Sequence, residues 1–152
     1  MPGFFFDSSA LVKLYHPEIG TPTVDQIVNA TGNLVRVSRL TIAELISAFA
    51  IKVRTQSISR EDADFFLRQF RRDIAAGKLE VFSIGESEFT ATELLVERHA
   101  FDSRLRALDA LQLAVALELR NQKLVDHFVA ADGILCEVAR LEGFSVINPE
   151  HS

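Results

Sequence analysis

The stretch FFFDSSALVK, residues 4–13, joins an apolar run, an acidic residue and the start of a helical pattern. Three consecutive Phe residues without polar alternation are typical of a strand buried on both faces, as in a parallel sheet. Asp7 ends that run, and the residues from Ser8 to about Tyr15 predict a helix, because Pro17 disfavours its continuation. A buried strand followed at once by a helix indicates an α/β domain.

The same alternation continues to the end of the chain. Apolar runs predict further strands at residues 34–37, 79–84, 124–131 and 144–147. Helical periodicity predicts helices at residues 21–30, 41–53, 59–76, 86–99, 105–119 and 133–142. Strands that alternate with helices indicate a central, mostly parallel five-stranded sheet covered on both faces. No repeat or flexible linker divides the sequence, which predicts one domain spanning residues 1–152.

Composition narrows the class of protein. With 48% hydrophobic and 24% charged residues, the chain is typical of a globular protein and not of a disordered one. No apolar run reaches the roughly 18 residues that a membrane span needs, and the N-terminus lacks the basic region of a signal peptide. The single cysteine, Cys136, lies among apolar residues and is expected to be buried and unreactive. We therefore expect a cytoplasmic protein without membrane association.

Charge and motifs restrict the function further. The net charge of −5 argues against a broad basic face for nucleic acid. It leaves open a nuclease in which metal ions supply the positive charge at the phosphate. Glycine-rich dinucleotide, P-loop and serine-hydrolase motifs are absent from the sequence, so those chemistries have no support.

Four acidic residues occupy positions where a charge is costly. Asp7 and Asp132 each follow a buried strand, and both are predicted to lie on one rim, where ligands of parallel sheets bind. Asp109 is the only charged residue between positions 106 and 118, and Glu44 shares its helix face with small and apolar residues. Crowded carboxylates repel one another unless a cation lies between them. Oxygen ligands select Mg²⁺ or Mn²⁺, whereas the four histidines are scattered without metal-ligand spacing.

Each of these acids also has a purely structural interpretation. Asp7 and Asp132 could cap the helices that follow them. Asp109 could pair with the arginine three residues earlier, and Glu44 could form a capping box with the threonine three residues earlier. Taken singly, these interpretations are favoured. Taken together, a functional site is favoured, since two strand-end acids meet two helix acids in this topology.

Four segments of the chain are similar to known motifs in order and spacing. They are FFFDSSALVK at 4–13, SRLTIAEL at 38–45, LRALDALQLA at 105–114, and FVAAD at 128–132 with VINP at 146–149. With these segments the chain resembles PIN-domain nucleases, specifically the VapC-like toxins of type II toxin–antitoxin systems. The resemblance covers essentially the whole chain.

The resemblance implies a PIN-like three-layer α/β/α sandwich and Mg²⁺- or Mn²⁺-dependent cleavage of RNA phosphodiester bonds. Asp7, Glu44, Asp109 and Asp132 fall on the family's acidic positions, which implies that they hold the metal and carry out catalysis. It also implies a cognate antitoxin with a basic tail as partner, and a homodimer.

Two positions depart from the family pattern. Gln112 stands where many relatives have His, which is compatible with a supporting role behind the acids. Ala130-Ala131 precede Asp132 where relatives often carry Ser or Thr, so a hydroxyl that would orient water or a carboxylate is expected to be missing.

In the expected mechanism, the three aspartates hold one or two ions, and Glu44 orients the attacking water or accepts its proton. Arginines that could bind flanking phosphates, with a solvated surface role as the alternative, are Arg36, Arg39, Arg54, Arg104 and Arg106. Competing functions are a PIN-fold RNA-processing nuclease without a toxin role and a catalytically silent PIN-fold binding module. A receiver-type phospho-acceptor is disfavoured, because no second acid accompanies Asp7 and no Lys follows the last strand.

Overall fold

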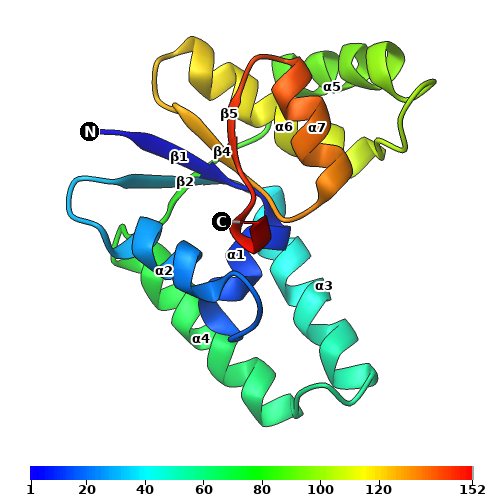
Figure 1. Cartoon of the computed structure of the whole chain (residues 1–152). Coiled ribbons are helices and arrows are strands. Elements are labelled where there is room, and N and C mark those ends of the chain that lie inside the picture. Colours follow the sequence, from blue (N-terminus) through cyan, green and yellow to red (C-terminus); the bar gives the residue numbers. More distant parts are fainter. Residues whose placement is uncertain (152) are drawn as a thin grey trace.

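A computed structural model, which describes residues 1–151, places a five-stranded sheet between two layers of helices (Figure 1). The strands are β1 (Gly3–Phe6), β2 (Leu34–Ser38), β3 (Glu80–Phe82), β4 (His127–Val129) and β5 (Ser145–Ile147). Their order is β3-β2-β1-β4-β5, and every neighbouring pair is parallel. The helices are α1 (Ser8–Tyr15), α2 (Thr21–Asn29), α3 (Leu40–Arg54), α4 (Arg60–Ala75), α5 (Glu86–His99), α6 (Ala107–Asn121) and α7 (Gly133–Leu141), followed by the 3-10 turn η1 (Pro149–His151). The predicted α/β fold and three-layer arrangement are confirmed.

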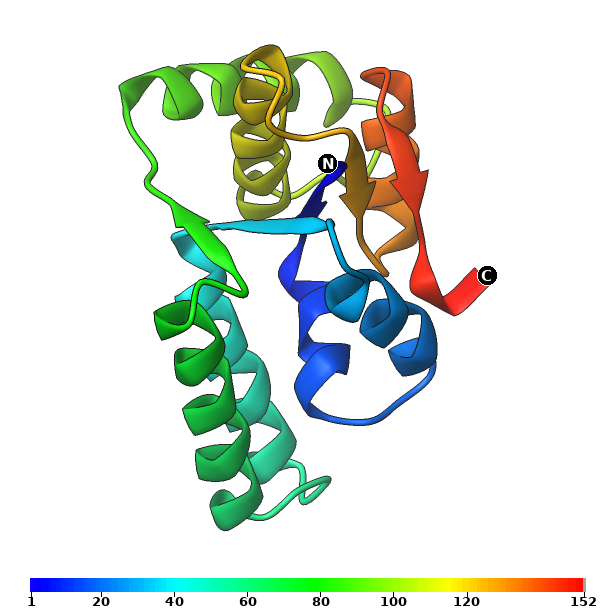
Figure 2. The same cartoon turned by 90° about the vertical axis from the view of Figure 1, so that its left-hand side faces the viewer.

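The three phenylalanines of β1 show why this strand is continuously apolar. Phe4 and Phe6 belong to a core that also contains residues of α1 to α4, whereas Phe5 packs on the other face with α5, α6 and α7. Figure 2 shows the two helical layers on either side of the sheet. Successive side chains of a strand point to opposite faces, so a central strand with two covered faces needs apolar residues at every position.

Two strands are shorter than the sequence predicted. β3 and β4 form only the middle of the apolar runs at 79–84 and 124–131. Leu79 and Val125 lie just before these strands and are buried without being part of them. The apolar runs therefore mark chain that enters the core, of which only part makes the hydrogen-bonded ladder.

α6 starts two residues later than predicted, at Ala107, because Arg106 is extended (φ −89°, ψ 156°) and serves as its N-cap residue. The helix is buried along most of its length, as its apolar sequence predicted. Asp109 consequently lies in the first helical turn, with Arg106 immediately outside the helix. Within residues 1–151 no helix, α6 included, is both long and apolar enough to cross a membrane.

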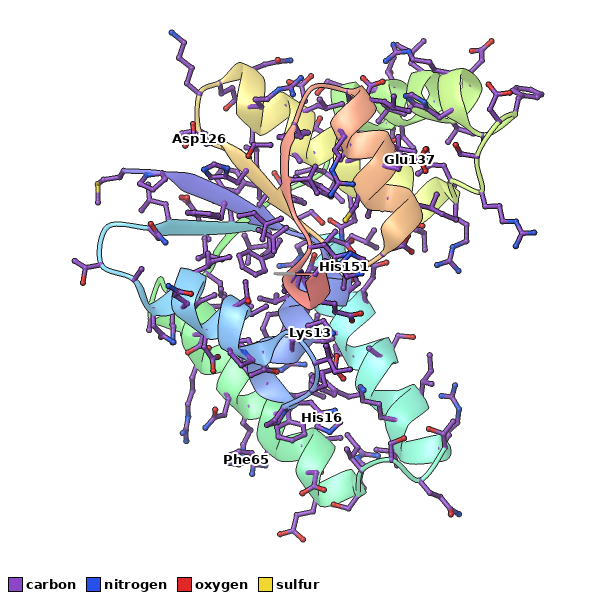
Figure 3. The ribbon with its side chains drawn as sticks, viewed as in Figure 1. Lys13, His16, Phe65, Asp126, Glu137 and His151 are labelled. Carbon is purple, nitrogen blue, oxygen red and sulfur yellow. The ribbon has the colours of Figure 1, made fainter. Side chains whose placement is uncertain are left out.

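A buried lysine ties α1 to the end of the chain. The side chain of Lys13 is nearly inaccessible, and its Nζ contacts Glu18 Oε1 at 2.9 Å and Glu150 Oε2 at 2.7 Å. Figure 3 shows Lys13 near the C-terminal turn. The two carboxylates raise the pKa of Lys13 against the desolvation that lowers it, so the amine remains charged. This ion-pair cluster holds the helix that begins directly after Asp7.

Cys136 is buried, and its Sγ donates to the carbonyl oxygen of Ala130 at 3.1 Å. Burial raises the pKa of the thiol to about 11. The expectation that the cysteine is buried is confirmed, and the raised pKa disfavours the thiolate that reactivity would need.

Candidate active site

Asp7 and Asp132 meet at the carboxyl ends of two neighbouring strands. β1 and β4 pair in parallel with Phe6 opposite Val129, and the Asp7 amide donates to the Val129 carbonyl oxygen at 2.9 Å. Asp132 follows β4 after two alanines and caps α7, since its Oδ1 accepts from the Leu135 amide at 3.0 Å. The prediction that both acids lie on one rim is confirmed by this pairing.

Asp7 is 4% exposed and is the N-cap of α1. Its Oδ2 accepts from the Ser9 amide at 3.2 Å and from the Ser9 hydroxyl at 2.6 Å. The Ser9 Oγ in turn accepts from the Ala131 amide at 3.0 Å. One hydroxyl therefore links Asp7 to the loop that carries Asp132. The hydroxyl expected to be missing at Ala130-Ala131 has a counterpart here, contributed by α1.

Glu44 lies on α3 and is held by a polar network beneath the rim. Gln112, fully buried on α6, donates through Nε2 to Glu44 Oε1 at 2.6 Å and to Thr41 Oγ1 at 2.9 Å. The Ser38 hydroxyl donates to Gln112 Oε1 at 2.7 Å, and the Ser8 hydroxyl donates to Glu44 Oε1 at 2.9 Å. Both amide protons and the amide oxygen of Gln112 are used, so its orientation is determined. The supporting role predicted for Gln112 agrees with these contacts.

The capping-box interpretation of Glu44 is wrong. α3 has Arg39 as its N-cap without a side-chain cap, and Thr41 lies inside the helix. Glu44 directs its hydrogen bonds to Ser8 and Gln112, on α1 and α6. A carboxylate bonded to other elements, and not to its own helix start, is oriented by the tertiary structure.

Asp109 faces the rim from the first turn of α6. Its Oδ2 lies 3.5 Å from Arg106 Nε, which is the local pair that the spacing predicted. The Arg106 side chain is 80% exposed, so this long contact contributes little. Together with Asp132, Asp109 borders a cavity of about 580 Å³.

The pKa values of Asp7 and Asp109 show that the charges of the acids act on one another. Burial raises the pKa of Asp7 to about 6; the Ser9 hydrogen bonds oppose this, and the charges of Glu44 and Asp109 add to it. The pKa of Asp109 is also raised, by burial first and then by the charge of Asp132. All four acids are thus coupled in one electrostatic cluster, hereafter the acid cluster.

The donor chemistry of the acid cluster fits a hard divalent ion. Within residues 1–151, protein hydrogen bonds reach one oxygen of each carboxylate, namely Asp7 Oδ2, Glu44 Oε1, Asp109 Oδ2 and Asp132 Oδ1. The second oxygen of each remains for a ligand. In this part of the chain no three His, Cys, Asp or Glu side chains lie in an arrangement that could hold a metal ion by themselves, so waters or the substrate would have to complete the coordination. An open set of carboxylates suits Mg²⁺, which keeps several waters and takes few protein ligands.

Arg36 was predicted as a phosphate-binding candidate and is excluded by its position. It is buried in β2, where its Nε contacts Glu80 Oε1 at 3.1 Å and its Nη1 donates to the Leu124 carbonyl oxygen at 2.6 Å. These contacts lie toward the amino ends of the strands, at the edge of the sheet opposite the acid cluster. Its role is to join β2, β3 and the segment before β4.

Sequence reasoning missed the hydroxyls that support the cluster: Ser8, Ser9, Ser38 and Thr41. A partial signal was available, because two serines directly follow Asp7 at a predicted helix start, where hydroxyls often bond backbone or acid groups. Apart from Asp7, two residues before Ser9, the partners of these hydroxyls lie in distant segments and could not be predicted.

Comparisons with known proteins agree with this geometry. A family model described as PIN domain matches residues 4–141. No curated protein sequence matches the chain significantly. Among solved structures, a chain of FitAcB from Neisseria gonorrhoeae is similar, with a TM-score of 0.64 at 16% identity, covering 98% of this chain and 99% of that one.

Two further similar structures are complexes. A chain of VapBC2 from Rickettsia felis, bound to a promoter DNA fragment, has a TM-score of 0.63 at 15% identity, covering 95% of this chain and 97% of that one. A chain of a toxin–antitoxin complex from Klebsiella pneumoniae has a TM-score of 0.59 at 16% identity, with coverages of 95% and 96%. At such identities the likeness concerns the fold. The parallel sheet, the rim of four acids and the match over residues 4–141 together show that the chain belongs to the PIN domain family.

Proposed function

We propose that this protein is a metal-dependent endoribonuclease and the toxin of a type II toxin–antitoxin pair. The observation that carries the proposal is the acid cluster: four carboxylates from the β1–α1 junction, α3, α6 and the β4–α7 junction, electrostatically coupled at one rim of a PIN-family sheet. Likeness to a chain of a toxin–antitoxin complex supports the toxin role.

In this proposal Asp7, Asp109 and Asp132 hold Mg²⁺ or Mn²⁺, directly or through water. When bound, the ion lowers the pKa of a bound water and neutralises charge that develops on the phosphate. Glu44 is the group that orients the attacking water or accepts its proton, with the carboxylate oxygen that Ser8 and Gln112 leave unbonded. Gln112 orients the Glu44 carboxylate through its other oxygen, and Ser9 holds Asp7 beside the Asp132 loop.

Purified protein is expected to cleave RNA with Mg²⁺ or Mn²⁺ and to lose all cleavage in EDTA, because the carboxylates alone supply no cation at the phosphate. The measurement is gel analysis of an RNA mixture with added metal, with EDTA, and after metal is restored. Asp109→Asn protein, purified in parallel, controls for copurifying nucleases. Full cleavage in EDTA, or equal cleavage by the variant, would rule out the proposed chemistry.

The partner proposed for this toxin is an antitoxin whose tail carries apolar residues and at least one arginine. α3 and α4 run side by side away from the sheet (Figures 1 and 2) and enclose an apolar groove of about 280 Å³. Its apolar lining includes Ile46, Phe49, Val53, Ala63 and Leu67. α3 also carries Glu44, so a segment lying along this helix can reach the acid cluster. An arginine of the antitoxin tail is suited to the part of the segment that reaches the acids, because its guanidinium binds carboxylates bidentately and stays charged.

Antitoxin and metal are therefore expected to compete. Where metal is saturating, raising Mn²⁺ tenfold should raise the antitoxin concentration for half-inhibition by up to about tenfold, by mass action at one site. The test titrates RNA cleavage with the protein product of the adjacent open reading frame, as candidate antitoxin, at two Mn²⁺ concentrations. Replacing the tail arginine by Ala should restore cleavage more than it weakens binding, since the apolar contacts remain. An inhibition curve that does not move with Mn²⁺ would place the inhibitor away from the acid cluster.

Growth arrest on expression separates the competing functions. Arrest that the adjacent open reading frame relieves is expected of a toxin. Metal-dependent cleavage without arrest would indicate an RNA-processing nuclease, and neither activity would indicate a binding module. The homodimer that the resemblance implies remains a proposal, which light scattering of the purified protein can check.

A further inference from the structure

We propose that Arg106, with Arg104 beside it, binds the phosphate next to the one that is cleaved, so that the RNA strand leaves the acid cluster along the segment before α6. The inference rests on the proposed nuclease function and names the substrate contact of the same site. Of the arginines that the sequence offered for flanking phosphates, these two line cavities that also reach the acids.

Arg106 lies where three cavities around the acid cluster meet its side chain. The cavity of about 580 Å³ beside Asp109 and Asp132 is also lined by Arg104 and Arg106. A second, of about 270 Å³, lies between Glu44 and Asp109, and a third, of about 540 Å³, lies beside Glu44 along α3. Arg106 lines all three. A strand that crosses the acids through any of these hollows passes this guanidinium.

Little within residues 1–151 holds the Arg106 side chain in place. Its backbone is the extended N-cap of α6, and the side chain makes no cap hydrogen bond. Its partner is Asp109, at a long 3.5 Å, and 80% of the side chain is exposed. Arg36, in contrast, is buried with two partners, and Arg54 lines the groove between α3 and α4. Arg106 can therefore exchange its weak contact with the Asp109 carboxylate for a stronger contact with a ligand.

Phosphate is the ligand that such an arginine favours. An RNA strand approaching a protein of net charge −5 meets repulsion from the acid cluster, and a metal ion at the carboxylates offsets it at one phosphate. The adjoining phosphate then lies outside the ion's reach and needs its own cation. A guanidinium binds phosphate oxygens through two parallel hydrogen bonds, and Arg104 on the same cavity wall adds a second positive charge.

The test measures binding separately from cleavage. A short, fluorescent 2′-O-methyl RNA of random sequence is titrated with wild-type protein and variants in Mn²⁺, from about 50 to about 300 mM KCl, and its integrity is checked on gels. Each phosphate contact on a single strand contributes about 0.7 to the slope of log affinity against log salt. Arg106→Ala should reduce the slope by about 0.7 and weaken binding about tenfold at low salt.

Arg60→Ala is the matched control. Arg60 is 82% exposed, pairs locally with Asp64 at 3.1 Å and starts α4, so the variant loses the same charge from a similar setting. Its salt slope should equal that of wild type. Arg106→Lys should keep the wild-type slope and recover only part of the affinity, because the charge remains and the bidentate geometry does not.

The outcomes separate this inference from the proposed function. Cleavage by wild-type protein together with equal slopes for wild type and Arg106→Ala overturns the role of Arg106 and leaves the nuclease intact. A change in Arg60→Ala as large as in Arg106→Ala also overturns it, because the effect is then one of net charge. Wild-type protein that neither binds nor cleaves RNA overturns both.

Discussion

Asp7→Asn is expected to reduce metal-dependent RNA cleavage by at least about 100-fold while making the metal-free protein more stable. Loss of a residue that merely supports a metal site typically costs about 10- to 100-fold, and Asp7 is proposed to hold the ion itself. The stability gain follows from crowding. Asp7 is buried, and Glu44 and Asp109 raise its pKa further, so its charge destabilises the folded state.

The pH dependence of this gain has a definite sign. The pKa of Asp7 rises from its ordinary value of 3.8 to about 6 on folding, so the folded protein binds the proton more tightly. The stabilisation that the folded protein gains by binding this proton is complete below about pH 4 and is lost as pH rises through about 6. A pKa rise of this size corresponds to at most about 3 kcal/mol of unfolding free energy. Asp7→Asn should therefore match wild type near pH 4 and exceed it by up to that amount above pH 7, as measured by denaturant unfolding in EDTA.

Asp126→Asn is the control for this prediction. Asp126 is an exposed acid just before β4 (Figure 3) that accepts from the Gly3 amide at 2.8 Å, at the start of β1 and not at the end that carries Asp7. The Asp126→Asn protein should retain RNA cleavage and should be no more stable than wild type above pH 7. If Asp7→Asn instead lost about 3–5 kcal/mol, the cost of breaking a buried pair, Asp7 would be a structural partner and the metal role would fail.

Mn²⁺ is expected to raise the melting temperature of the wild-type protein by several degrees and that of Asp7→Asn much less. An ion that binds only the folded state at about 100 times its dissociation constant stabilises it by about 2.7 kcal/mol. For a chain of this length, each kcal/mol shifts the melting temperature by about 2–4 °C. In wild type the ion also relieves the repulsion that, after burial, raises the pKa values of Asp7 and Asp109.

Thermal scans with increasing Mn²⁺ measure this shift without any cleavage assay. Asp126→Asn, which keeps the acid cluster, should follow wild type at every concentration. Equal shifts in wild type and Asp7→Asn would show that the ion binds elsewhere on the protein.

Much of this architecture could be predicted from local patterns, because each pattern has one physical cause. The Phe run at residues 4–6 indicated a strand covered on both faces, since alternate side chains face alternate helical layers. The same reasoning placed Asp7 and Asp132 together, because parallel strands bring their carboxyl ends to one edge. Where a prediction failed, as with the ends of β3 and β4, apolar residues were buried without joining the ladder.

The roles of Glu44 and of the arginines could not be predicted from local sequence patterns. Glu44 fitted a capping box in sequence, and only the packing of α1 and α6 against α3 redirected it to Ser8 and Gln112. Gln112 joins positions 68, 71 and 74 residues away in the chain, and no local pattern encodes such partners. The arginines looked equivalent until burial assigned Arg36 to the opposite edge.

The sequence by itself determined the layers, the parallel sheet and the shared rim of the two strand-end acids, because side-chain periodicity and strand direction are local properties. Only the tertiary structure decided which hydroxyls and which amide orient the acids, and which arginine stands beside them. These contacts depend on how separate elements pack, since a hydrogen bond or an ion pair requires two groups within a few ångströms whatever their distance along the chain.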